Sequence, residues 1–314
     1  MGPPPAIAYR VAQWLSVGLP PRAAFGLAGR LADLHCATAP KDAAIVHANL
    51  QILLGRALPL RAPQVGEVFR NFGRYLAEFL AIHRVGDPEV TVTGRPCLQQ
   101  AAEARRGVIL LGAHVGNWEV GAVLVRRMGL PIAVVALPHQ QAGVNAVFTA
   151  QRRRCGVEVI ALGRAAMRQS LSWLRQGALV GMLGDRNFSD RGIAVTFCNG
   201  MRLLPRGPAV LSLRSGAPVV PTFLIREGLW KFRCCFEPPI WPGAHGRTDR
   251  AVASLTQAYA AALERVVQRL PEQWLMFQPI HSTSEPRPTG FSPWHRAGIL
   301  FPPRTQVRGF RGAG

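Results

Sequence analysis

The chain has 314 residues, of which 48% are hydrophobic, and a formal net charge of +20 from 37 basic and 17 acidic side chains. This hydrophobic content supports a packed core and excludes an intrinsically disordered protein. The charge favours anionic partners such as nucleic acid, lipid headgroups or an acidic carrier protein, although coding bias toward Arg would give the same count.

Several classes of protein find no support in the sequence. The six cysteines form no Cys-x-x-Cys pair and no Cys/His metal spacing, so we expect reduced thiols and no metal. Neither a nucleotide-binding glycine motif nor a Gly-x-Ser-x-Gly elbow is present. We expect no signal peptide and no membrane-spanning helix, because the best apolar stretch, Val11 to Pro21, is about half the ~20 residues needed.

The first predicted elements are helical. Tyr9 to Leu34 indicates two amphipathic helices broken at Gly18 to Pro21, and Trp14 among arginines suits a membrane interface. The alternative is a helical hairpin packed on the rest of the chain. Helices over residues 43–54 and 63–83 follow, and then a strand over 90–94 and a helix over 97–105.

The central stretch combines a strand, a turn and a helix. Val108 to Leu111 is a branched apolar run between two glycines, which predicts a short buried strand. His114 follows the turn, and Asn117 can cap a helix over Glu119 to Arg127. A histidine just past the carboxyl end of an inner strand lies where open α/β sheets place their chemistry.

His114 and Glu119 are the candidate catalytic pair. With the histidine in the turn and Glu119 in the helix, the carboxylate can fold back to one ring nitrogen and raise the basicity of the other. Such an imidazole can take a proton from a hydroxyl that attacks a thioester, and backbone N–H groups after His114 are candidate oxyanion donors. The alternative is a histidine that caps a turn, with Glu119 favouring the helix N-terminus.

Strands and helices alternate after this block. The predicted strands are residues 131–137, 157–162, 178–183, 216–225 and 230–236, and the predicted helices are 144–154, 167–176 and 249–269. The alternation predicts an α/β fold with a mixed, mostly parallel sheet of about seven strands flanked by helices. We divide the chain into an N-terminal interfacial helical segment (1–40), an α/β domain (41–280) and a disordered Pro/Arg/Gly-rich tail (281–314).

Polar residues follow a second strand. Asp185 and Arg186 come after residues 178–183 as His114 comes after its own strand, so they can open onto the same crevice; the alternative is a local turn. Gly207 opens a helix whose free N–H groups can face anions. The run Arg152 to Arg154, taken alone, is typical of a solvated face.

These segments together resemble a known family. GAHVGNWE, which contains His114 and Glu119, is similar to the His-x-x-x-x-Asp/Glu block of the glycerolipid acyltransferase superfamily, and its GNWE form to the lipid A biosynthesis acyltransferases. Later segments match in order: Gly-Asp at 184–185, Gly-Pro-Ala at 207–209, Gly-Ala-Pro-Val-Val-Pro at 216–221 and Pro-Glu-Gln-Trp-Leu at 271–275. Arg186, Cys198 and Met276 depart from the commoner residues of the family.

The resemblance implies an acyltransferase in which a His114/Glu119 dyad acts as general base. The acyl donor would be an acyl carrier protein or coenzyme A thioester, the acceptor a hydroxyl of an anionic glycolipid such as a lipid A precursor, and no cofactor would be needed. Substrate contacts are assigned to Asn117, Arg154, Asp185, Arg186 and Gly207. Arg154 is the candidate for an anionic headgroup, because the family carries an Arg before a Gly-Val-x-Val-Ile strand.

Because the N-terminal segment of the family is membrane-associated, the resemblance also implies a peripheral or monotopic protein at the cytoplasmic face of the inner membrane. We expect a monomer that binds no nucleic acid. Three alternatives stay open: a basic, non-enzymatic protein that binds nucleic acid or anionic lipid, a related enzyme acting on another phospholipid or glycolipid, and a family member that hydrolyses the thioester.

Overall fold

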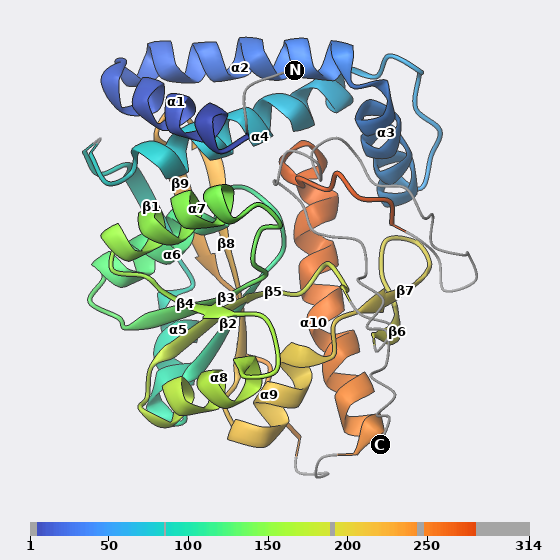
Figure 1. Ribbon diagram of the computed structural model, residues 1–314. Helices are drawn as coiled ribbons and strands as arrows, with labels where there is room; N and C mark the ends of the chain where they lie inside the picture. Colours follow the sequence, from blue (N-terminus) through green and yellow to red (C-terminus); the bar gives the residue numbers. More distant parts are fainter. Residues whose placement is uncertain (1–4, 85, 189–191, 244–247, 281–314) are drawn as a thin grey trace, which may run out of the picture.

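The computed structural model describes residues 5–84, 86–188, 192–243 and 248–280 (Figure 1). The tail expected at 281–314 lies outside the described residues. The chain begins with α1 (Pro5–Gly18), α2 (Pro21–Thr38), α3 (Pro40–Leu54) and α4 (Pro63–Ala81). A proline stands at the first position of α2, α3 and α4, where its fixed φ suits a helix and its missing N–H costs no hydrogen bond. The break between α1 and α2 falls where the sequence predicts it.

Helix α4 joins this helical layer to the rest of the molecule. Its aromatic face, which includes Phe69, Phe72 and Tyr75, is buried against α2 and against Leu275 and Phe277 near the end of the described chain. Figure 1 shows α1 and α2 lying across α4 at the top of the molecule. The aromatic stripe of α4 is therefore mainly core, although Phe72 and Tyr75 also line the cavity described below.

The main sheet confirms the predicted fold class. Its seven strands are β1 (Glu89–Thr93), β2 (Val108–Gly112), β3 (Ile132–Ala136), β4 (Glu158–Ala161), β5 (Leu179–Leu183), β8 (Val219–Gly228) and β9 (Lys231–Phe236). The strand order is β1-β9-β8-β2-β5-β3-β4, and all pairs are parallel except the β8–β9 hairpin. The sheet is thus mixed and mostly parallel, as the alternation of strands and helices predicts.

Helices cover both faces of the sheet because its inner strands are apolar throughout. Helices α5 (Arg95–Glu103) and α6 (Trp118–Arg127) pack with Val108 and Leu110 of β2. Helices α8 (Ala166–Arg175), α9 (Gly207–Ser215) and α10 (Asp249–Arg269) pack with Ile109 and Leu111 on the opposite face. Helix α7 (Ala142–Arg154) lies between β3 and β4 in the chain and contacts α1.

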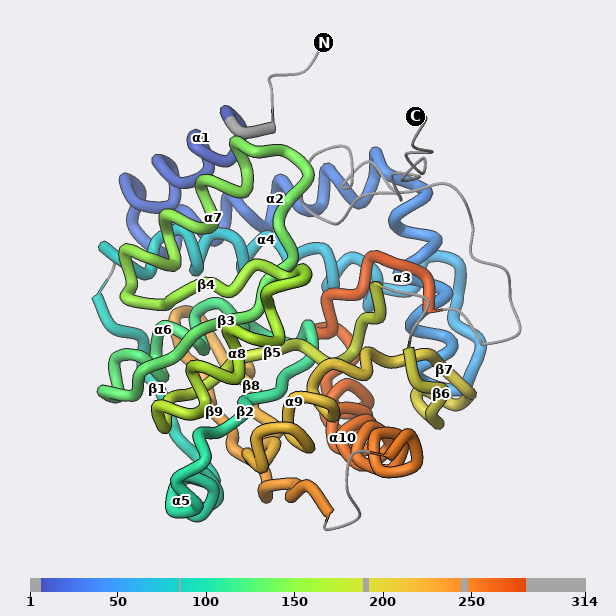
Figure 2. The backbone as a smooth tube through the Cα atoms, turned by 60° about the horizontal axis from the view of Figure 1, so that its bottom comes forward, coloured from blue at the N-terminus to red at the C-terminus, as the bar shows by residue number. Residues whose placement is uncertain are grey.

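One hairpin, formed by β6 (Ile193–Thr196) and β7 (Met201–Leu204), is not among the predicted elements. Its strands have only four residues each, and its turn uses positive φ angles at Cys198 and Asn199. The Asn199 side chain donates hydrogen bonds to the Ile52 and Leu53 carbonyls at 2.8 and 3.1 Å. The hairpin therefore closes onto the end of α3, and the two lie side by side in Figures 1 and 2.

Candidate functional site

The parallel pairing of β2 and β5 brings His114 and Asp185 together. Gly112 is paired with Leu183, and His114 and Asp185 each lie two positions further along the chain from these paired residues. The Asp185 carboxylate receives His114 Nδ1–H on Oδ1 at 2.7 Å and the His114 backbone N–H on Oδ2 at 2.9 Å. Both residues are buried, with 7% of His114 and 3% of Asp185 exposed. This arrangement fixes the ring orientation and leaves Nε2 as the basic nitrogen.

The turn after His114 requires a glycine. Gly116 has φ +64°, and a Cβ added there would lie 1.9 Å from the Leu224 carbonyl oxygen of β8. The prediction that backbone N–H groups of this turn serve as oxyanion donors is wrong, because these groups already donate to protein carbonyls. Gly116 N–H donates to the Gln273 carbonyl at 3.1 Å and Asn117 N–H to the Leu224 carbonyl at 2.9 Å.

Asn117 is buried and its side chain is engaged by protein groups. Its Oδ1 accepts the Val120 N–H at 3.1 Å, so it caps α6 as the sequence predicts. Its Nδ2 donates to Glu78 at 2.7 Å and to the Tyr75 carbonyl at 3.2 Å. Asn117 does not line the cavity described below, so the substrate contact assigned to it is replaced by a structural role.

Glu119 does not bond His114, contrary to the expected dyad. Its carboxylate instead receives two hydrogen bonds from Arg152 of α7, at 2.8 and 2.5 Å, in a buried bidentate ion pair. The reason is the position of Asp185, which already occupies Nδ1 of the ring. Glu119 still lines the same cavity as His114.

The buried charges set the protonation of the site. Burial lowers the pKa of His114 below its ordinary 6.5, and the Arg186 charge lowers it further against the opposing effect of Asp185. Burial alone would raise the pKa of Asp185, but His114 and Arg186 outweigh it and hold that pKa at about 2. The histidine is therefore neutral and the aspartate ionised near neutral pH.

Arg186 is fixed at the edge of this pair. Its Nη2 donates to the Leu275 carbonyl at 2.6 Å and its Nε to Met276 Sδ at 3.2 Å. Within the part of the chain that the structure describes, Nη1 is buried without a hydrogen-bond partner. Desolvation lowers the pKa of Arg186 to about 10, so the guanidinium stays charged near neutral pH. Its charge acts on His114 and Asp185 through its electric field.

A mostly apolar cavity of about 620 Å³ adjoins His114. It runs along the sheet face that carries α6, past Gly121 and Gly181, whose missing side chains keep it open. A Cβ on Gly181 would lie 3.2 Å from Val134. Leu162 and Phe188, each 40% exposed, border the cavity where it meets the surface. The space suits an extended hydrocarbon chain whose reacting end lies at the imidazole.

The remaining predicted residues divide between the cavity and the surface. Gly207, at the start of α9, lines the cavity, and its contact with substrate stays a prediction. Arg154 is exposed at the end of α7 and does not line the cavity, so the predicted headgroup contact would lie outside it. Arg152 takes the inward position instead. The helical period of α7 predicts that Arg152 points inward. Its buried residues recur at helical spacing and are Val144, Val147, Phe148, Gln151 and Arg152.

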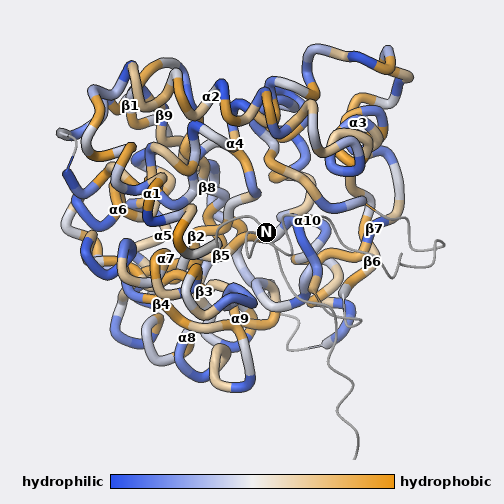
Figure 3. Tube along the Cα trace, turned by 45° about the horizontal axis from the view of Figure 1, so that its top comes forward, coloured by the Kyte–Doolittle hydropathy of each residue, from blue (hydrophilic) through white to orange (hydrophobic). Residues whose placement is uncertain are grey.

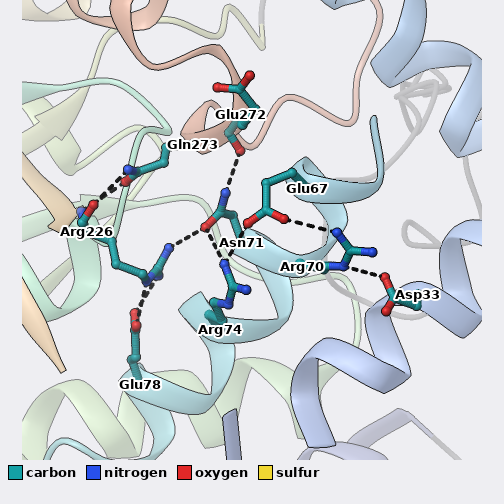
Figure 4. A network of polar contacts seen from close by, with 9 residues as sticks. All are labelled: Asp33, Glu67, Arg70, Asn71, Arg74, Glu78, Arg226, Glu272 and Gln273. Atoms are coloured by element: carbon teal, nitrogen blue, oxygen red, sulfur yellow. Dashed lines mark hydrogen bonds and ion pairs between the residues drawn. The ribbon is translucent and has the colours of Figure 1, made fainter. Parts of the chain in front are cut away.

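A polar network between α4 and β8 is linked through Asn117 to the turn after His114, and Figure 4 shows its members Asn71, Glu78 and Arg226. Arg226 of β8 makes two hydrogen bonds of 2.6 Å to Glu78 of α4, which in turn accepts the Asn117 side chain. Arg226 also donates to Asn71 at 2.8 Å. The turn that carries His114 is thereby fixed to the helical layer as well as to the sheet. Among the described residues, no group of three or more His, Cys, Asp or Glu side chains is placed to hold a metal ion.

Comparison with known proteins identifies the chemistry. The model of the bacterial lipid A biosynthesis acyltransferase family matches residues 6–283. The phosphatidylinositol mannoside acyltransferase of Mycobacterium tuberculosis (strain ATCC 25618 / H37Rv) is 28% identical over 67% of this chain and 67% of its own. The lipid A biosynthesis palmitoleoyltransferase of Escherichia coli (strain K12) is 27% identical over 89% of this chain and 90% of its own.

Among solved structures, the 1-acyl-sn-glycerophosphate acyltransferase PlsC of Thermotoga maritima aligns with 81% of this chain and 99% of its own. The TM-score is 0.37 and the identity 15%, a likeness too loose to add to the assignment. The family match covers nearly all the described residues and favours an enzyme over the non-enzymatic alternative. This chain belongs to the bacterial lipid A biosynthesis acyltransferase family.

Proposed function

We propose that this protein is an O-acyltransferase that moves a fatty acyl chain from an acyl thioester to a hydroxyl of a glycolipid. The observation that carries the proposal is a neutral His114, held through Nδ1 by Asp185, beside a mostly apolar cavity of about 620 Å³. A base and a hydrocarbon site lie together, as acyl transfer requires.

In the proposed reaction, His114 Nε2 takes the proton of the substrate hydroxyl as its oxygen attacks the thioester carbonyl. The tetrahedral intermediate then collapses, the carbon–sulfur bond breaks, and the imidazolium returns the proton to the leaving sulfur. Asp185 stays ionised and stabilises the imidazolium, the role that an orienting carboxylate has in catalytic triads. General base action of this kind contributes about 10² to 10⁴ in rate.

The proposed oxyanion donors are the first-turn N–H groups of α6, at Trp118 and Glu119. Helix geometry leaves such groups without an intrahelical acceptor, and both residues line the cavity. The edge of the Trp118 ring lies against His114, with ring centroids 4.9 Å apart. An oxyanion beside this helix start would also gain from the helix dipole.

The two substrates follow from charge and from the relatives. Arg152, Arg186 and Arg206 line the cavity, and Glu119 is the only acidic residue in its described lining. Glu119 is neutralised by Arg152, so the site favours an anionic acceptor and a donor that carries phosphate, either acyl carrier protein or coenzyme A. The matched relatives are a phosphatidylinositol mannoside acyltransferase and a lipid A biosynthesis palmitoleoyltransferase, which supports a glycolipid acceptor.

We also propose that the protein lies on the cytoplasmic face of the membrane through α1 and α2. No helix of the described chain is long and apolar enough to cross a bilayer, and apolar and polar residues alternate along α1 and α2 in Figure 3. Trp14, Leu31 and Leu34 are 73%, 54% and 61% exposed. Replacing all three with Ser should release the protein from anionic vesicles in sedimentation, and unchanged binding would refute this surface.

The test of the proposed function is acyl transfer by the purified protein and by His114→Ala. Palmitoyl-coenzyme A and palmitoyl-acyl carrier protein are each offered with a lipid A precursor or phosphatidylinositol mannoside, and products are identified by mass spectrometry. We expect one acylated glycolipid from the wild type and a loss of about 10² to 10⁴ in turnover for the variant. Near-wild-type turnover in a folded His114→Ala protein, or release of free fatty acid alone, would overturn the proposal.

A further inference from the structure

The segment that follows α10 lies directly against the turn that carries His114. Gly116 N–H donates to the Gln273 carbonyl at 3.1 Å, and Leu275 N–H donates to the His114 carbonyl at 2.7 Å. Trp274, between these two contacts, forms an isolated antiparallel bridge with the turn. The two segments are more than 150 residues apart in sequence, so this contact is made only by the folded protein.

The Trp274 side chain reaches past the turn to the carboxylate behind it. Its Nε1–H donates to Asp185 Oδ2 at 2.9 Å, and the residue is only 2% exposed. The same oxygen accepts the His114 backbone N–H at 2.9 Å, while Oδ1 accepts His114 Nδ1–H at 2.7 Å. The carboxylate thus has two donors on one oxygen and the catalytic imidazole on the other.

Those two donors differ from the imidazole in one respect: neither takes part in proton transfer. A carboxylate turns easily about its Cβ–Cγ bond when one oxygen alone is held. A backbone N–H and a buried indole on Oδ2 restrict that rotation, and so hold Oδ1 in the direction of Nδ1.

The tryptophan is itself rigidly supported. The Gln273 side chain exchanges two hydrogen bonds with the Arg226 backbone, at 3.0 and 2.9 Å, and Asn71 donates to the Glu272 carbonyl at 3.0 Å (Figure 4). On the other side, Asn49 donates to the Met276 carbonyl at 2.9 Å. The segment is therefore tied to α3, α4 and β8 around the indole.

We propose that Trp274 is a positioning residue for the reaction, because its indole N–H fixes the Asp185 carboxylate in the orientation that holds the general base. This inference rests on the proposed function, since it needs His114 to act as base. The competing explanation is that Trp274 only fills the core, where its ring packs edge-on against Phe197 with centroids 6.3 Å apart. The two explanations differ in what the N–H alone contributes.

The experiment removes the N–H and keeps the ring. β-(3-Benzothienyl)alanine at position 274 replaces the N–H by sulfur at nearly constant shape, and Trp274→Phe removes it together with part of the ring. With palmitoyl thioester donor and saturating acceptor, we expect kcat of the benzothienyl protein to fall roughly 3- to 10-fold with little change in KM. The acidic limb of the pH–rate profile should move to lower pH, because a carboxylate that is no longer held in line with Nδ1 stabilises the imidazolium less and the pKa of His114 falls.

Trp230→Phe is the matched control. The Trp230 indole also donates one hydrogen bond, to the Gly86 carbonyl at 2.7 Å, but its ring packs against Phe25 and Phe232 and does not line the cavity. Its kcat and pH profile should equal those of the wild type. A benzothienyl protein with wild-type kcat and an unmoved acidic limb would overturn the inference, even if Trp274→Phe is unstable. In that case an inactive His114→Ala would still support the proposed function, whereas an active one would refute both.

Discussion

Two carboxylates approach the same histidine and have contrasting surroundings. Asp185, at the end of β5, accepts three hydrogen bonds, two from His114 and one from Trp274. Glu119, in the first turn of α6, is bound on both oxygens by the permanently charged Arg152. In the proposed reaction, Asp185 is thus coupled to a group that changes charge, whereas Glu119 is coupled to one that does not.

This contrast separates two ways in which a carboxylate supports an active site. A carboxylate on the imidazole acts on the reaction, because it stabilises the charge that appears when the base takes a proton. A carboxylate on a buried arginine acts on the structure, because it prevents an uncompensated charge in the cavity wall. Substitutions at the two positions should therefore give different patterns of damage.

Asp185→Asn should have the largest effect. The neutral amide cannot balance the positive charge of the imidazolium. It can also hold the ring in the wrong tautomer by donating to Nδ1. We expect kcat to fall by about 10² to 10⁴ while the protein stays folded, as measured by acyl transfer and circular dichroism. Asp87→Asn is the matched control, since that carboxylate is 77% exposed in its ion pair with Arg127, which does not line the cavity. A loss below tenfold would contradict the assignment of Asp185.

Glu119→Gln should have a smaller effect on turnover and a larger one on stability. The glutamine keeps one acceptor for Arg152 but leaves the arginine charge uncompensated in a wall where the two side chains are 9% and 6% exposed. We expect a loss of roughly 1–3 kcal/mol in the free energy of unfolding and a fall in kcat of roughly tenfold, read from chemical denaturation and initial rates.

Glu237→Gln serves as the control for that variant, because Glu237 pairs with Arg265 at 2.7 Å on the surface. Its stability should change by well under 1 kcal/mol. If Glu119→Gln instead matched Asp185→Asn in kcat at unchanged stability, Glu119 rather than Asp185 would be the partner of the base.

The fold was largely predictable because its signals are local. Short apolar runs bounded by glycine or proline, such as Val108 to Leu111, mark buried strands, and the alternation with helices restricts the sheet to a mostly parallel one. The β6–β7 hairpin escaped prediction because its stability comes from contacts with α3 and α10 rather than from its own pattern.

The sequence brings forward some of the residues at the site but not their pairings. His114, Glu119, Asp185 and Arg186 are among the predicted residues, yet a histidine in the turn with a glutamate in the following helix favoured Glu119 as the partner of the imidazole. The actual partner depends on β5 lying next to β2, with Gly112 opposite Leu183, and no local pattern records which strands are neighbours. Trp274 depends on a contact still more distant in sequence.

Arg186→Gln should give the smallest and most specific effect, a displaced pH profile. The Arg186 charge lowers the pKa of His114, so its removal raises that pKa toward the ordinary value. The base must be neutral to act, and a higher pKa therefore moves the acidic limb of kcat to higher pH, with little change on the plateau.

The measurement is kcat against pH for Arg186→Gln and for Arg214→Gln, an exposed arginine on α9 that does not line the cavity. The Arg214 variant should follow the wild-type curve. An acidic limb that stayed in place or moved to lower pH in Arg186→Gln would mean that the arginine does not act on the base through its field. Arg186 also lowers the pKa of Asp185. If its charge had no effect on the base, the difference between Asp185 and Glu119 would rest on their hydrogen bonds alone.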